Sequence, residues 1–100
     1  MTITIVSADK KIAALMAAPA GKGIKGLQPH EVKKIRTQIS VLLAANSMVE
    51  IVEAHPEWRV HRYNGDQRHW SFDVGGATRL LMEWDDDRKE VSNVRFDNPH

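Results

Sequence analysis

The chain has 100 residues, no cysteine and a formal net charge of +1, from 14 Lys and Arg against 13 Asp and Glu. This length predicts one domain over residues 1–100, and the lack of cysteine excludes disulfides, thiolate catalysis and cysteine-bound zinc. No apolar run approaches the roughly 20 residues that cross a bilayer, and residues 1–11 lack the features of a secretory signal. We therefore expect a cytoplasmic protein with no membrane partner.

The first half of the sequence predicts a short strand followed by two to three helices. Residues 2–6 form a β-branched run typical of a strand. Ser7 is suited to cap a first helix that ends near the first proline. Apolar residues at helical spacing then predict the longest helix, from Pro29 to residue 44 or 45. Ser47 and Glu50 have capping-box spacing, so a short third helix is expected over residues 48–54.

The second half predicts an antiparallel sheet. Residues 58–84 read as three strands joined at Asn64-Gly65-Asp66 and at Gly75-Gly76, because these residues tolerate the positive φ of tight hairpins. Apolar and polar side chains alternate in the second and third strands, so each strand has an apolar face and a polar face. Residues 91–96 predict a last strand.

This order predicts an α+β fold. We expect an N-terminal strand and two to three helices packed on one face of a mainly antiparallel sheet of four to five strands. The other face of the sheet is then available for a site.

Basic side chains gather in the sheet region of this nearly neutral chain. They are Arg59, His61, Arg62, Arg68, His69 and Arg79. The planar guanidinium of arginine binds phosphate through two parallel hydrogen bonds, so the cluster favours a phosphate-containing ligand. A solvated sheet face explains it equally well, with Arg79 in an ion pair with Asp66, Asp73 or Glu83. A metal site of His61, His69 and His100 is a weaker hypothesis, because no two histidines are closely spaced on one element.

A set of residues in this half follows a recognisable order: a His before Gly-Asp, an aromatic-Ser pair, an Arg in the next strand, an aromatic at its end, and a terminal His. They are His61, Gly65-Asp66, Trp70-Ser71, Arg79, Trp84 and His100, with a looser agreement at Lys25-Gly26-Leu27. In this order the chain resembles HigB-type toxins of the RelE superfamily, the toxin half of bacterial type II toxin–antitoxin pairs. The chain differs from that family at Asn64, where a basic residue is usual, and at Pro99, where a tyrosine is usual.

The resemblance implies ribosome-dependent cleavage of messenger RNA, with the ribosome, mRNA and a small helix-turn-helix antitoxin as partners. RNA carries its own nucleophile, the 2′-OH, so the reaction needs a base, an acid and a cation, and no cofactor or metal. His61 and His100 are the candidate acid and base, unassigned between the two roles, because histidine titrates near neutral pH. Arg79 is the candidate phosphate clamp.

Further residues are expected to contact the substrate. Arg62 or Arg68 would supply the charge that is absent at Asn64, and Tyr63 would stack on a base. The candidate substrate-binding set is therefore Arg62, Tyr63, Asn64 and Arg68.

Two other functions stay open. The same fold could act by binding alone, either by occluding a protein target or as a degenerate toxin that only pairs with its antitoxin. The residues Asn64 and Pro99 favour this alternative. Composition by itself predicts no more than a structural or regulatory domain without toxicity.

Overall fold

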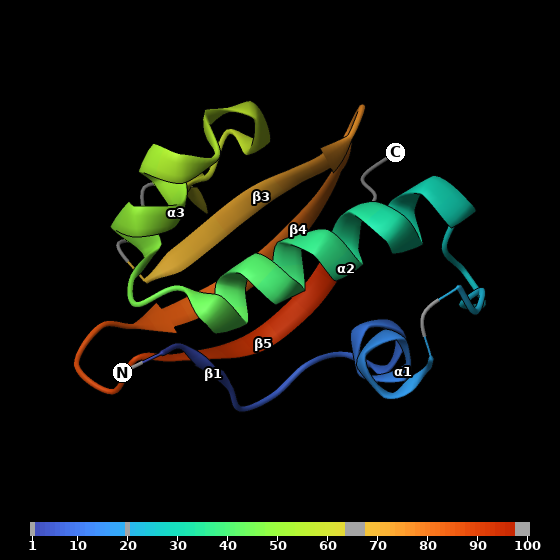
Figure 1. The fold of residues 1–100 in the computed structure, drawn as a ribbon, viewed down its shortest axis with the longest axis horizontal. Helices are drawn as coiled ribbons and strands as arrows, with labels where there is room; N and C mark the ends of the chain where they lie inside the picture. The colour runs from blue at the N-terminus through green and yellow to red at the C-terminus, as the bar shows by residue number, and fades with distance from the viewer. Residues whose placement is uncertain (1, 20, 64–67, 98–100) are drawn as a thin grey trace.

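The computed structural model of the protein describes residues 2–19, 21–63 and 68–97. Their elements confirm the predicted α+β class (Figure 1). In chain order they are β1 (Thr4–Ile5), α1 (Lys10–Ala17), α2 (Pro29–Ala44), α3 (Met48–Ala54), a 3-10 helix (Pro56–Trp58), β2 (His61–Arg62), β3 (His69–Gly75), β4 (Thr78–Asp85) and β5 (Glu90–Asp97). None of the helices in these ranges is long and apolar enough to span a membrane.

The strands form one sheet in the order β1-β5-β4-β3-β2. Strands β2 to β5 pair antiparallel, as expected, whereas β1 pairs with β5 in parallel, so the sheet is mixed. Gly76 has a φ of +54° in the turn between β3 and β4, which confirms the predicted glycine hairpin. The other predicted turn, Asn64-Gly65-Asp66, lies outside the described residues.

The first strand of the predicted meander is shorter than expected. Residues 58–60 are not part of it, because Pro56 begins a 3-10 turn that includes Trp58. The Trp58 ring is buried and stacks on His55, with ring centroids 3.9 Å apart and planes 5° apart. Because this tryptophan packs in the core, residues 58–60 do not join the strand, and β2 consists only of His61 and Arg62.

The cap of α1 also differs from the prediction. Asp9 is the N-cap, and its Oδ1 accepts the backbone N–H of Ile12 at 2.8 Å, while Oδ2 accepts that of Phe96 in β5 at 3.3 Å. The predicted cap, Ser7, instead accepts the N–H of Asn93 with its hydroxyl at 2.7 Å. A long-range contact with β5 thus uses the Ser7 hydroxyl, and the helix begins two residues later.

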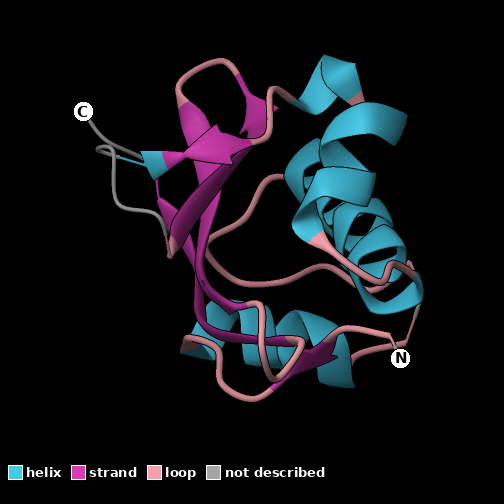
Figure 2. Ribbon diagram, turned by 90° about the vertical axis from the view of Figure 1, so that its left-hand side faces the viewer, coloured by secondary structure: helices cyan, strands magenta, loops and turns pink. Residues whose placement is uncertain are grey.

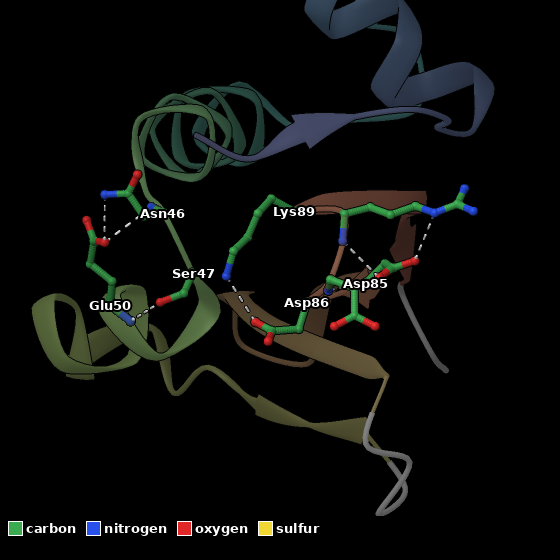
Figure 3. Close-up of polar contacts among 8 residues, drawn as sticks. Asn46, Ser47, Glu50, Asp85, Asp86 and Lys89 are labelled. Carbon is green, nitrogen blue, oxygen red and sulfur yellow. Dashed lines mark hydrogen bonds and ion pairs between the residues drawn. The ribbon is translucent and has the colours of Figure 1, made fainter. Parts of the chain in front are cut away.

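The other two helices begin as predicted. Pro29 is the first residue of α2, and the Glu31 carboxylate accepts the N–H of Gln28 at 2.7 Å. Ser47 caps α3 by accepting the N–H of Glu50 at 3.3 Å (Figure 3). The Glu50 carboxylate reaches back to the N–H of Asn46 at 3.2 Å. These local bonds satisfy helix N–H groups that have no partner within the helix.

The core lies between the helices and one face of the sheet. Figure 1 shows α2 crossing the sheet, and apolar side chains of α1, α2, α3 and β3–β5 form a single buried cluster. Its fully buried members include Ile12, Leu15, Ile35, Leu42, Met48, Phe72, Leu80, Met82, Val91 and Val94. Gln38 of α2 is fully buried as well and donates its Nε2 hydrogen to the backbone carbonyl of Asp73 at 2.7 Å. This bond holds α2 to β3 where the register of β3 shifts.

The turn between β4 and β5 is polar. The Asp85 carboxylate accepts the N–H groups of Asp87 and Arg88 at 3.1 and 3.2 Å, and Lys89 pairs with Asp86 at 3.3 Å (Figure 3). Aspartate favours such turns because its short side chain bonds the backbone two or three residues on.

Candidate functional site

The candidate site is the face of β2–β5 opposite to the core, which we call the open face. In Figure 2 the α-helices lie to the right of the sheet and below it, so none of the α-helices in the described ranges covers its left-hand side. Residues that are paired across neighbouring strands share a face, so the strand register identifies the members of this surface. They are His61, His69, Ser71, Asp73, Arg79, Leu81, Glu83, Ser92, Arg95 and Asp97.

One row of this face runs across four strands. The register pairs His61 with Ser71, Ser71 with Leu81, and Leu81 with Arg95. Neighbouring strands are about 4.8 Å apart, so the row joins the exposed His61 at the edge of the sheet to Arg95 in β5. Ser71 and Leu81 are buried between them. The row therefore has buried residues at its centre and polar residues at its ends.

His61 has a defined ring orientation. Its Nδ1 lies 2.5 Å from the backbone carbonyl of Arg59, which has a φ of +49° at the end of the 3-10 turn. A carbonyl oxygen only accepts hydrogen bonds, so Nδ1 carries the ring hydrogen in this contact. In the neutral ring, the lone pair of Nε2 is then available as an acceptor. This arrangement suits a general base.

Arg79 lies between two acidic residues on the same face. It is opposite Asp73 in β3 and opposite Asp97 in β5. The Asp73 carboxylate pairs instead with Arg59, at 3.7 Å, and Glu83 accepts a hydrogen bond from Asn93 at 3.1 Å. Within the described residues, Arg79 makes no ion pair. The expected pairing with Asp73 or Glu83 is thus not formed there, and Asp66 lies outside those residues.

A third group of side chains on this face involves Arg95, which the sequence analysis did not identify. Its Nη2 lies 2.5 Å from Nε2 of His69, and its Nη1 donates to the backbone carbonyl of Asn93 at 3.1 Å. The His69 ring in turn lies 5.4 Å from the Tyr63 ring, with their planes inclined by 60°. This group, Tyr63, His69 and Arg95, is called the β5 cluster below.

A backbone irregularity explains why Arg95 was missed. Simple alternation along β5 places residues 91, 93 and 95 on one face, and Val91 belongs to the core. Asn93 instead has a φ of +52°, and the pairing of β4 with β5 shifts there, so Val91 and Val94 are both buried. A β-bulge of this kind moves every later residue to the opposite face. No local sequence signal marks it apart from an asparagine, which tolerates positive φ.

The structure brings only some of the predicted site residues together. His61 and Arg79 share the open face, and Tyr63 contacts His69 beside them. Arg62 lies on the other side of the sheet, 5.8 Å from the centre of the Trp70 ring. Arg68 pairs with Asp85 at 3.9 Å, at the far end of β4. Asn64 and His100 lie outside the described residues.

The charges of this surface are balanced. The face has two arginines, Arg79 and Arg95, and three carboxylates, Asp73, Glu83 and Asp97, among the described residues. Arg59 adds a third positive charge, because it pairs with Asp73 from the end of the 3-10 turn. A surface without net charge attracts a polyanion weakly over long distances, although single arginines can still bind single phosphates. In the described ranges, no group of three or more His, Asp or Glu side chains could hold a metal ion.

No protein-family model and no curated protein matches the chain.

Proposed function

We propose that the chain is a HigB-type toxin that cleaves messenger RNA on the ribosome. The observation that carries the proposal is the arrangement of His61, whose Nδ1 is held by a backbone carbonyl and whose Nε2 is left as an acceptor, on the same sheet face as Arg79. A base and a phosphate-binding cation on one open face are two of the three groups that the reaction requires.

The proposed reaction begins at the 2′-OH of the RNA. Nε2 of His61 accepts the hydroxyl proton, and the oxygen attacks the adjacent phosphorus. Arg79 stabilises the added negative charge of the pentavalent phosphorane. The bond to the 5′-oxygen then breaks, and that oxygen takes a proton from a general acid, leaving a 2′,3′-cyclic phosphate and a free 5′-OH. His100 remains the predicted acid. It follows Asp97 by three residues in the sequence and lies outside the described residues.

The balanced charge of the open face supports a role for the ribosome. Free RNA binding gains most of its affinity from phosphate neutralisation by a net positive surface, which the described residues of this face lack. A ribosome would present the mRNA strand already positioned, so the protein would need only local contacts with it. Translating ribosomes as the target imply a cytoplasmic protein, kept inactive by a cognate helix-turn-helix antitoxin.

The test is cleavage of an mRNA on purified translating ribosomes, with new 5′ ends mapped to the nucleotide. We expect wild-type protein to cut within translated codons. Replacement of Arg79 by alanine should lower the single-turnover rate by about 10² to 10³, and His61→Ala should lower it by about 10² to 10⁴. The control is Arg88→Ala, which removes an exposed arginine in the β4–β5 turn and should leave the rate within a few-fold.

Thermal unfolding of each variant would show that it is folded. Intact mRNA after incubation with folded wild-type protein would contradict the nuclease proposal, and so would full activity of Arg79→Ala.

The residues Asn64 and Pro99 favour a second candidate, a protein of the same fold that acts by binding alone. Growth arrest on expression that persists in the double variant His61→Ala, His100→Ala would select this candidate. Harmless expression of the wild-type protein would exclude toxicity by either route.

A further inference from the structure

The β5 cluster holds an arginine in a fixed orientation on the open face. His69 and Arg95 come from β3 and β5, the strands on either side of β4, so their contact crosses above β4. The second bond of the guanidinium, to the Asn93 carbonyl, depends on the bulge of β5. An exposed arginine normally loses side-chain entropy when a ligand fixes it. Two existing bonds reduce that loss for Arg95.

The guanidinium of Arg95 also keeps unused hydrogen-bonding capacity. It has five N–H donors, and the two observed bonds use two of them. Arg95 makes no ion pair with any carboxylate in the described part of the chain. A half-buried cation whose charge is not paired, with donors to spare, is suited to bind an anion with the geometry of a phosphate.

An aromatic ring lies next to this cation. Tyr63 is half-buried and packs its ring against that of His69, which itself contacts Arg95. Single-stranded RNA is commonly held by an aromatic ring that stacks on a base and a nearby arginine that contacts the backbone. The combination therefore points to a nucleotide and not to a free anion.

The position of the cluster relative to Arg79 also fits an RNA strand. Arg79 is paired with Asp97, and Arg95 precedes Asp97 by two residues in the same strand. Diagonal neighbours of this kind have Cα atoms about 7 to 8 Å apart. That spacing is of the order of the distance between successive phosphates in an extended RNA strand.

We propose that Tyr63, His69 and Arg95 form a nucleotide-binding subsite for single-stranded RNA, in which Arg95 binds the phosphate next to the one held by Arg79. The proposal rests on the proposed function, since it takes RNA as the ligand of the open face. It assigns to Arg95 and His69 a role in positioning the strand, separate from the proton transfers at His61.

Two experiments test the subsite, and the first of them does not depend on cleavage. The first titrates folded protein with a four-nucleotide RNA carrying 2′-O-methyl groups, which cannot be cleaved, and follows the imidazole nitrogen signals of His69 by NMR. We expect the His69 signals to move and Arg95→Gln to weaken binding about tenfold or more. The logarithm of the binding constant decreases linearly with the logarithm of the salt concentration, and the steepness of this line should be smaller by about 0.7 in this variant. A change of this size corresponds to one lost phosphate contact with a single strand. Arg88→Gln, with the same change of charge, should change neither quantity beyond the error.

The second experiment is the ribosome assay with Arg95→Gln and Arg95→Lys. A positioning role predicts that Arg95→Gln raises KM about tenfold to a hundredfold with kcat within a few-fold, and that Arg95→Lys restores part of the loss. His61→Ala should instead lower kcat.

The outcomes separate the two proposals. If wild-type protein cleaves nothing but the RNA still moves the His69 signals and Arg95→Gln weakens binding, the subsite stands and the nuclease function fails. Unmoved His69 signals, or equal affinities and equal salt slopes for Arg95→Gln and wild type, would overturn the subsite whether or not cleavage occurs.

Discussion

Leu80 and Leu81 are neighbours in β4 whose side chains point to opposite faces of the sheet, and they offer a direct test of the open face. Leu80 is fully buried in the core, opposite Phe72. Leu81 is 3% exposed, yet it lies on the open face opposite Arg95. Replacing either leucine by alanine removes the same atoms from nearly the same degree of burial. Any difference in the free energy of unfolding must therefore come from what covers each side chain.

The expected magnitudes differ by at least 1 kcal/mol. Removing three carbons from the core loses about 2.4 kcal/mol at about 0.8 kcal/mol per carbon. For Leu80→Ala a residual cavity in the close-packed core adds to this loss, giving a total of about 3 to 4 kcal/mol. For Leu81→Ala the polar side chains of Arg95 and its neighbours can move into the space that the leucine side chain leaves, and water can enter that space. We therefore expect a loss of about 1 to 2 kcal/mol.

Urea denaturation of wild type and both variants, followed by circular dichroism, measures these costs. The slope of the free energy with denaturant should be the same in all three, so that the midpoints report stability alone. In thermal unfolding each 1 kcal/mol should lower Tm by about 4 to 8 °C for a chain of this size. Equal losses for Leu80→Ala and Leu81→Ala would refute the reasoning. They would mean that the second face is packed as tightly as the core and is not an open surface.

Three further predictions concern single contacts. Asp9→Ala should cost about 1 to 2 kcal/mol in urea denaturation, because its carboxylate caps α1 and also accepts an N–H of β5; a loss below 0.5 kcal/mol would contradict this. Asn93→Val should cost more than 1 kcal/mol while Asn93→Gly costs less, because a β-branched residue is strained at a φ of +52°. The hydrogen bond from His55 lowers the pKa of Glu57 in the folded protein. The pair therefore stabilises the fold at pH values above the pKa that Glu57 has in the unfolded chain. This contribution is lost as the pH falls through the pKa that Glu57 has in the folded protein. Carboxyl NMR titration should show the Glu57 pKa rising towards its ordinary value in His55→Ala, and an unchanged value would exclude the hydrogen bond as its cause.

Local sequence signals predicted those elements whose boundaries depend on local chemistry. The apolar spacing and Pro29 predicted α2, and the pair Ser47 and Glu50 predicted α3. Gly75-Gly76 predicted the β3–β4 hairpin. In each case the residues that form or end the element lie within a few positions of one another, so tertiary packing had little to change.

The errors occur where a distant segment competes for a residue. Ser7 has the chemistry of a helix cap, but β5 uses its hydroxyl, and Asp9 takes the cap. Trp58 has strand propensity, but burial of its ring in the core holds it in a 3-10 turn. The choice of cap for α1 depends on a contact with β5, which is far away in sequence, so local sequence does not show it. At Trp58 the local sign is Pro56, which begins the turn, and the contact of the Trp58 ring with Phe72 adds a distant contribution.

The residues of the candidate site likewise include some whose position local sequence predicts and some whose position depends on tertiary structure. Residues 69–73 of β3 and 79–83 of β4 pair in regular alternation, so the sequence alone determined that Arg79 would lie on the face opposite to the core. Only the tertiary structure decided which other arginines lie on the same face as Arg79. The register of the two-residue strand β2 places Arg62 on the core side, over Trp70, and the bulge at Asn93 turns Arg95 to the open face. Since a shift of one residue reverses the face of every later side chain, such a placement depends on strand pairing, which local sequence does not encode.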